Sequence, residues 1–188
     1  GLITEVDFSS GKPPYICKNE KGEEISAQTV IISTGATAKW LGIPSEQRLN
    51  GSGVSACAVC DGFFYRGQEV AIVGAGDSAC EEALYLSKLC TTVHMLIRRD
   101  QMRASKIMQD RVLRTSNIKV YWNSETDEIL GDKVVEAVRI KNTKDGSLQE
   151  IPITGFFVAI GHTPQSKIFS KYVETDNDGY IKVIPGTT

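Results

Sequence analysis

The 188-residue sequence lacks several features that mark large classes of proteins. It contains no apolar run of the ~18–20 residues needed to span a bilayer, and no secretory signal opens it. Its net charge of −2 argues against a general affinity for nucleic acid or membranes. The five cysteines are an odd number without the spacing of a disulfide scaffold, which favours a reducing compartment. We therefore expect a cytoplasmic protein that binds neither nucleic acid nor membrane.

A zinc site also has little support. Such a site needs four ligands, usually two Cys or His pairs at short spacing. The sequence has one such pair, Cys57 and Cys60, and the other candidates are unpaired and fall mostly in expected strands or helices: Cys17, Cys80, Cys90, His94 and His162. We therefore expect no metal. We interpret Cys80 and Cys90 as packing residues, and we assign no chemical role to either histidine.

What is present is a nucleotide-binding βαβ pattern between Gly67 and Arg103. The β-branched run Glu69–Val73 predicts a buried parallel strand, and it ends in a G-x-G-x-x-A turn. In such a turn Gly74 permits the tight bend, Gly76 lets the backbone approach a pyrophosphate, and Ala79 allows close packing of helix on strand. The N-terminus of the following helix would face the phosphates.

The end of the second strand of this unit indicates which dinucleotide binds. An NAD-binding unit carries Asp or Glu about 20 residues after the glycines, on the ribose 2′-OH. This sequence has Arg98 and Arg99 there, with Arg103 a turn further on. Guanidinium groups bind a 2′-phosphate, which a carboxylate would repel, so NADPH is the expected cofactor. The alternative is that the glycines form an ordinary turn with no ligand, and that the arginines at the end of the second strand are simply exposed to solvent.

A Cys-x-x-Cys pair lies just before the βαβ unit. Cys57 and Cys60 can close a small, reducible disulfide ring, and Asp61 is placed to exchange the protons that thiol chemistry moves. The alternatives are a zinc site and two inert buried cysteines.

The remaining pattern predicts an α/β, Rossmann-like FAD/NAD(P)-binding fold with three layers: a parallel sheet, helices and an antiparallel β-meander. Residues 2–36 and 127–162 share one layout, so the first copy is expected to be the remnant of a second, similar domain; a chance likeness of two meanders is the alternative. The expected helices cover residues 79–89 and 104–114. The expected strands, besides Glu69–Val73, are Leu2–Phe8, Tyr15–Lys18, Glu24–Ile25, Thr29–Ile32, Val93–Ile97, Ile118–Trp122, Glu128–Leu130, Val134–Lys141, Leu148–Ile153, Phe156–Ile160 and Tyr180–Val183.

Five motifs in this order resemble low-molecular-weight thioredoxin reductase, and the likeness extends over essentially the whole chain. They are Cys57–Gly62, Gly74–Ala83, Arg98–Asp100, Arg103–Ile107 and Val158–Pro164. The resemblance implies a flavoprotein homodimer that passes electrons from NADPH to FAD, to the cysteine pair and then to thioredoxin.

The resemblance also implies a role for each matching residue. Cys60 would face the flavin, Cys57 would attack the thioredoxin disulfide, and Asp61 would be the acid/base. The cofactor residues would be Gly74, Gly76, Asp77, Ser78 and Ala79 at the pyrophosphate, Arg98, Arg99 and Arg103 at the 2′-phosphate, and Thr34 and Gly35 as the remnant of the FAD site. Hinges are expected at Ala36–Leu41 and Ala159–Pro164.

The sequence departs from this family in lacking a second Gly-rich fingerprint and the Gly-Asp flavin motif. We expect residues 1–38 to be the remnant of an FAD domain, 39–162 the NADPH domain and 163–188 a return segment. We further expect this fragment to bind NADPH at best and to have no reductase activity alone. The alternatives are the flavoprotein reductase of a peroxiredoxin system and a stand-alone NADPH-binding module.

Overall fold

The computed structural model describes residues 1–186, which form two compact units. One unit is Ala38–Gly161, and the other combines Gly1–Thr37 with the segment that begins at His162. We describe each unit by itself.

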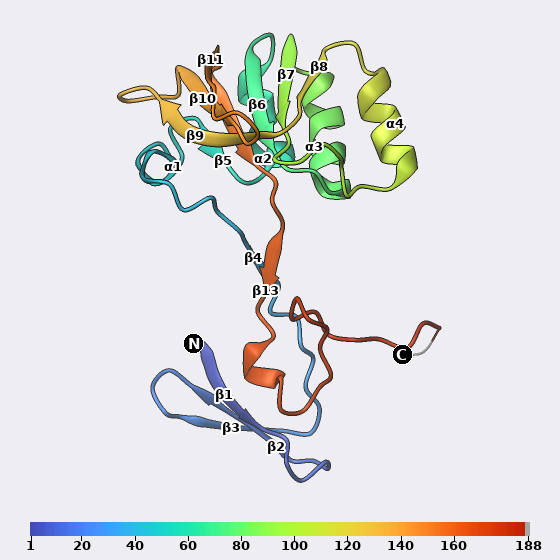
Figure 1. The fold of residues 1–188 in the computed structure, drawn as a ribbon. Helices are drawn as coiled ribbons and strands as arrows, with labels where there is room; N and C mark the ends of the chain where they lie inside the picture. The colour runs from blue at the N-terminus through green and yellow to red at the C-terminus, as the bar shows by residue number, and fades with distance from the viewer. Residues whose placement is uncertain (187–188) are drawn as a thin grey trace. The chain divides into compact units, whose positions relative to one another are not determined.

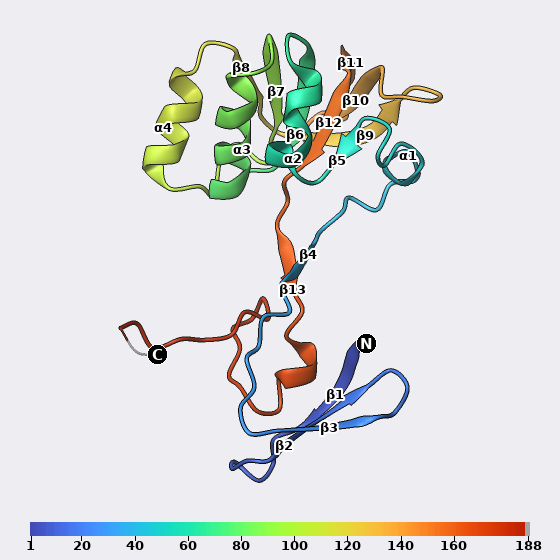
Figure 2. The same cartoon turned by 180° about the vertical axis from the view of Figure 1, so that it is seen from behind.

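The larger unit is built on a five-stranded parallel sheet (Figures 1 and 2). Its strands lie in the order β5 (Val54–Ser55), β12 (Gly155–Val158), β6 (Glu69–Val73), β7 (Thr92–Leu96) and β8 (Ile118–Tyr121). The strands β6, β7 and β12 are buried almost throughout, as expected for parallel strands covered on both faces.

Two helices, α3 (Asp77–Ser87) and α4 (Lys106–Arg114), cover one face of this sheet. Alternate residues of β6 and β7 point toward them, because successive side chains of a strand face opposite ways. Val70, Ile72, Val93 and Met95 therefore pack in one cluster with the buried side of α3.

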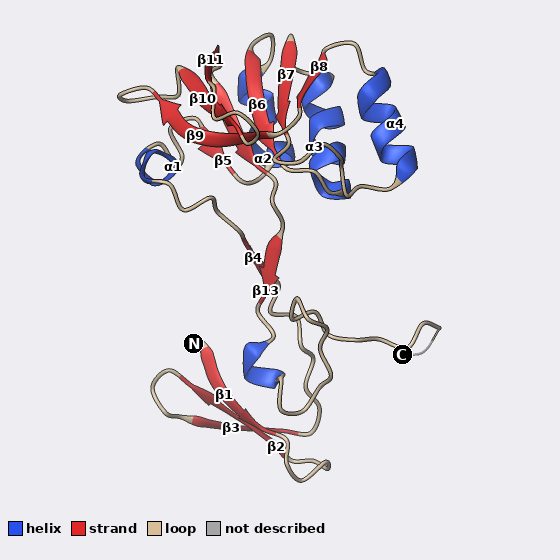
Figure 3. Cartoon of the chain, in the orientation of Figure 1, coloured by secondary structure: helices blue, strands red, loops and turns tan. Residues whose placement is uncertain are grey.

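The other face is covered by an antiparallel meander of β9 (Ser124–Leu130), β10 (Ala137–Asn142) and β11 (Leu148–Pro152), as Figure 3 shows. Ala71, Val73 and Leu96 pack against it. Two short helices, α1 (Pro44–Arg48) and α2 (Ala58–Asp61), precede β6, and α2 continues into the 3₁₀ turn Gly62–Tyr65. The predicted three-layer α/β fold is confirmed.

The smaller unit contains a second antiparallel meander, β1 (Ile3–Asp7), β2 (Tyr15–Asn19) and β3 (Glu24–Ala27). Two three-residue strands, β4 (Ala36–Ala38) and β13 (His162–Pro164), pair with each other, and a 3₁₀ turn follows at Lys167–Phe169. The common layout predicted for residues 2–36 and 127–162 is present in the meanders, but not in the strand expected after the first one.

That strand, Thr29–Ile32, was predicted wrongly. The segment is irregular and Ile31 is 90% exposed. Within residues 1–186 no strand pairs with it, and an apolar β-branched run forms a strand only where a sheet accepts its hydrogen bonds. The strand predicted at Tyr180–Val183 is also wrong, because only one isolated bridge, Thr175 with Ile181, forms there.

No helix within residues 1–186 combines the length and the apolar composition that crossing a membrane requires.

Candidate nucleotide pocket and disulfide

The glycine turn between β6 and α3 is packed too tightly for a side chain at its first position. Gly74 has φ +152°, and a Cβ there would lie 2.2 Å from the carbonyl oxygen of Ala159 and 2.7 Å from the Cβ of Ala79. The end of β12 and the start of α3 thus meet across Gly74, as the fingerprint predicts.

The third residue of the turn faces open space. A Cβ built on Gly76 has no atom within 4 Å, and no side chain caps α3 at this position. The first N–H groups of a helix have no partner inside the helix, and they attract anions. This side of the turn can therefore receive a phosphate group. In the first turn of α3, Ser78 is exposed and Ala79 is buried.

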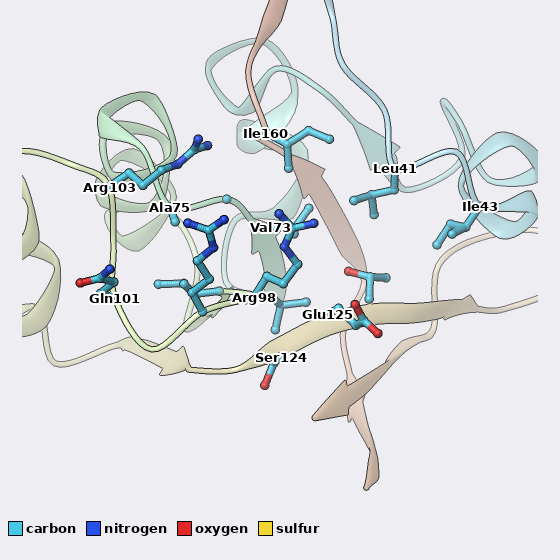
Figure 4. Close-up of a pocket in the computed structure, with 15 residues that line it drawn as sticks. Leu41, Ile43, Val73, Ala75, Arg98, Gln101, Arg103, Ser124, Glu125 and Ile160 are labelled. Atoms are coloured by element: carbon cyan, nitrogen blue, oxygen red, sulfur yellow. The ribbon is translucent and has the colours of Figure 1, made fainter. Parts of the chain in front are cut away.

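A pocket of about 410 Å³ opens at the carboxyl ends of β6 and β7. Gly74, Arg98, Arg99 and Arg103 all line it, and Figure 4 shows Arg98 and Arg103 extending along it. The N–H of Arg103 donates to the carbonyl of Ala75 at 2.8 Å, which joins the arginine loop to the glycine turn. The structure thus brings the predicted arginines to one cavity.

The rest of the pocket wall comes from residues that the sequence analysis did not predict to be near the nucleotide. Leu41 and Ile43 line its far side in Figure 4, and Ile160 and residues 124–126 of β9 complete it. No local motif marks these residues, because only the tertiary fold brings the loop before α1 and the meander to the glycine turn.

Asp77 does not direct its carboxylate to the pocket. The carboxylate accepts hydrogen bonds from the backbone N–H and the hydroxyl of Ser105, which hold the pKa of Asp77 below its ordinary value. Asp77 is also not among the residues that line the pocket, so its side chain does not take the place predicted for it there.

Cys57 and Cys60 form a disulfide, with 5.3 Å between their Cα atoms. Cys57 is half-buried and Cys60 is exposed. The Sγ atom of Cys57 accepts the N–H of Cys60 at 3.2 Å. A hydrogen bond of this kind stabilises a thiolate once the disulfide is reduced. Because both sulfurs are tied to each other, they are not available as a pair of metal-binding thiolates in this state.

The segment that carries the disulfide, residues 57–65, packs on helix α3; we call it the disulfide segment. The N–H of Ala58 donates to Oε2 of Glu82 at 3.4 Å. A Cβ on Gly62 would lie 2.9 Å from Cδ2 of Leu86 and 3.2 Å from Cε1 of Tyr85, so the backbone at Gly62 packs closely on the side chains of α3. One helix therefore carries the glycine turn at its N-terminus and the disulfide segment on its side.

Asp61 lies half-buried at the end of α2, near Tyr65. Burial raises the pKa of the Tyr65 hydroxyl, and the Asp61 charge raises it further. The Tyr65 ring packs edge-on against Phe157 with 5.4 Å between the ring centres, which anchors the disulfide segment to the sheet.

The other sulfur and histidine candidates lie apart from this chemistry. Cys80 and Cys90 are buried, and burial raises the pKa of each thiol to about 11. His94 is buried in β7 between the Tyr121 hydroxyl at 3.1 Å and the Glu69 carboxylate at 2.8 Å. Within the described residues no group of three or more His, Cys, Asp or Glu side chains is arranged to hold a metal ion.

Thr34 and Gly35, the expected remnant of an FAD site, belong to the smaller unit and do not line this pocket. Both are exposed, and the Thr34 hydroxyl donates to the carbonyl of Gln165 at 2.6 Å.

Comparison with known proteins places these features in a family. The sequence profile described as pyridine nucleotide-disulphide oxidoreductase matches residues 2–185. The chain is 46% identical to a thioredoxin reductase of Rickettsia conorii and 44% identical to thioredoxin reductase 1 of Saccharomyces cerevisiae, in each case over 99% of its length. It spans 60% of the length of each of these proteins.

Among solved structures, thioredoxin reductase from Giardia duodenalis matches 97% of the chain with 41% identity and a TM-score of 0.86. The Lactococcus lactis thioredoxin reductase matches 98% with 37% identity and a TM-score of 0.83; each match covers 60% of the solved chain.

Proposed function

The chain belongs to the pyridine nucleotide-disulphide oxidoreductase family, and we propose that it is the NADPH-binding and disulfide-carrying part of a thioredoxin-disulfide reductase. The observation that carries the proposal is that one helix, α3, presents the glycine turn and packs against the Cys57–Cys60 segment. The proposal takes its substrate from the thioredoxin reductases that the chain resembles.

The residues at the pocket support NADPH as the cofactor. Gly74 and Gly76 with the N-terminus of α3 bind the pyrophosphate, and Arg98, Arg99 and Arg103 bind the 2′-phosphate. Bound NADPH supplies two electrons as a hydride. Arginines rather than a carboxylate line the pocket directly after β7, at Arg98 and Arg99, which favours NADPH over NADH.

We propose that the residues of this chain do not by themselves form an FAD site. Thr34 and Gly35 are exposed, and Gly74–Ala79 is the one Gly-rich strand–turn–helix fingerprint in the sequence. We therefore propose no step through FAD in this chain, and we expect the 188 residues alone to have no NADPH-driven reductase activity. In the whole protein, a flavin in a homodimer would link NADPH to the disulfide.

The cysteine pair then acts by thiol–disulfide exchange. Two electrons and two protons convert the disulfide to two thiols. The Cys57 thiolate, stabilised by the Cys60 N–H, attacks one sulfur of the thioredoxin disulfide and forms a mixed disulfide, which releases a thioredoxin thiolate. The Cys60 thiolate attacks Cys57 in turn, which releases reduced thioredoxin and restores the Cys57–Cys60 disulfide. Asp61 donates and accepts the protons.

Exposed apolar side chains beside the disulfide support a protein substrate. Val59, Phe63 and Phe64 are 65%, 62% and 73% exposed, and all lie within four residues of Cys60. Large exposed apolar groups near a reactive centre are typical of a docking surface.

The experiment is trapping of the mixed disulfide. The Cys60→Ser variant is reduced, freed of reductant and mixed with a thioredoxin in which one cysteine of the disulfide is replaced by Ser and the other is activated as a mixed disulfide with a small aromatic thiol. No second thioredoxin thiolate can then reverse the exchange, and we expect a covalent 1:1 adduct through Cys57. The Cys57→Ser variant should give much less adduct. Reversed yields would exchange the roles of the two cysteines, whereas no adduct with either variant would contradict thioredoxin as the substrate.

A further inference from the structure

Glu46 is a buried carboxylate beside the pocket that none of the proposed cofactor contacts uses. Its residue is only 1% exposed. Its Oε1 atom accepts the N–H of Leu41 and its Oε2 atom accepts the N–H of Gly42, both at 2.8 Å. Glu46 does not itself line the pocket, but Leu41 and Ile43 do.

The two hydrogen bonds fix the course of the loop before α1. A buried carboxylate requires hydrogen-bond donors, and backbone N–H groups that bind a charged oxygen make stronger bonds than they make with a neutral one. Gly42 has φ +79°, a conformation that glycine adopts easily and that turns the chain at this point. The position of Leu41 and Ile43 therefore depends on where Glu46 is held.

Helix α1 is in turn hydrogen-bonded to β9 and to the residues just after it, and β9 forms another part of the pocket wall. The hydroxyl oxygen of Ser45 accepts the N–H of Ile129 in β9 at 3.0 Å. Arg48 donates to the carbonyl of Asp132, just beyond β9, at 3.2 Å. Strand β9 supplies residues 124–126 to the pocket, so Ser45 and Glu46, adjacent in sequence, connect two of its walls.

We propose that Glu46 is a positioning residue for nucleotide binding, which holds Leu41 and Ile43 as the apolar wall that the adenine ring of NADPH contacts. This inference rests on the proposed function. The adenine and the 2′-phosphate are attached to the same ribose, and the arginines and the apolar wall belong to the same cavity. The nicotinamide lies beyond the pyrophosphate and therefore farther from the 2′-phosphate than adenine does, which is why we assign adenine rather than nicotinamide to this wall.

The test is the Glu46→Gln variant, which keeps the shape but replaces one acceptor oxygen with an NH₂ group that cannot accept the loop N–H. Glu136→Gln makes the same chemical change at an exposed position of the same unit and is the control. Binding of NADPH and of 2′,5′-ADP is measured by calorimetry, and inorganic phosphate is titrated as a competitor that lacks adenine.

We expect Glu46→Gln to weaken NADPH and 2′,5′-ADP alike, by about tenfold, while the affinity for inorganic phosphate stays unchanged. Glu136→Gln should behave as the wild-type chain does. Equal affinities in the wild-type and Glu46→Gln chains would overturn the inference, as would an equal loss of phosphate binding, which indicates general damage. A wild-type chain that fails to bind NADPH would instead overturn the proposed function.

The wall is also tested without altering the buried carboxylate. The double variant Leu41→Ala, Ile43→Ala removes the apolar groups and leaves the Glu46 acceptors and both backbone donors in place. We expect the same selective loss of the two adenine-bearing ligands, and unchanged binding would overturn the assignment of the wall. This variant keeps the inference testable if Glu46→Gln does not fold.

Discussion

One carboxylate oxygen of Asp77 accepts two hydrogen bonds from Ser105, from the backbone N–H at 2.9 Å and from the hydroxyl at 2.8 Å. This contact joins the start of α3 to the start of α4. It also directs the Asp77 carboxylate toward Ser105, and Asp77 does not line the pocket proposed for the nucleotide.

Replacing Asp77 by Asn tests this contact through pH. Because the folded pKa of Asp77 is lowered, its carboxylate stabilises the fold above the unfolded value of 3.8, and this stability is lost as the pH falls through the folded pKa. We expect the variant to be less stable than the wild-type chain at pH 7 and the difference to shrink below about pH 4. Urea unfolding at several pH values measures it, with Asp132→Asn as the control. A difference independent of pH would show that the charge is not responsible.

Two alanine substitutions in the glycine turn should differ strongly in their effect on stability. Gly74→Ala places a Cβ 2.2 Å from the Ala159 carbonyl at a positive φ, so we expect a loss of about 2–5 kcal/mol in the free energy of unfolding. Gly76→Ala meets no atom within 4 Å, so stability should change by less than about 1 kcal/mol.

The Gly76→Ala methyl group nevertheless points into the space assigned to the pyrophosphate. We expect NADPH affinity to fall at least about tenfold in a variant that melts normally. Thermal unfolding and NADPH titration of both variants check the pair. Normal NADPH binding by Gly76→Ala would contradict the position assigned to the pyrophosphate.

The arginines should determine the choice of cofactor. Replacing Arg98 and Arg99 by Ala should weaken NADPH by about 1.5–3 kcal/mol for each charge-assisted bond lost, with little effect on NADH. Arg114→Ala, an exposed substitution at the end of α4, is the control. Parallel titrations with both nucleotides measure the effect, and equal losses for the two would refute the assignment.

The five cysteines should separate into reactive and inert groups. At pH 8 a thiol of pKa about 11 is ionised to only about one part in a thousand, and Cys80 and Cys90 are also buried. After reduction we expect iodoacetamide to modify Cys57 and Cys60 quickly and these two slowly, with all five modified in urea. Peptide mass spectrometry reads the sites. Rapid modification of Cys80 in the folded chain would contradict its packing role.

The sequence was most informative where a function requires a local pattern. The buried run Glu69–Val73, the glycine turn and the arginines after β7 lie within one βαβ unit, so their spacing alone predicted that they would meet. Leu41, Ile43 and Glu46 could not be predicted in this way, because their place depends on how α1 packs against β9. At Thr29–Ile32 the sequence predicted a strand that does not form. The segment has a high strand propensity, but within the described residues no neighbouring strand pairs with it.

The disulfide closes a very short loop, since Cys57 and Cys60 are separated by only three positions. A cross-link restricts the unfolded chain less as its loop becomes shorter, so this one contributes little to holding the domain together. Gly62 and Tyr65 keep the segment in place by packing instead. Opening and closing this bond should therefore leave the architecture of the unit intact, as the proposed carrier of two electrons requires.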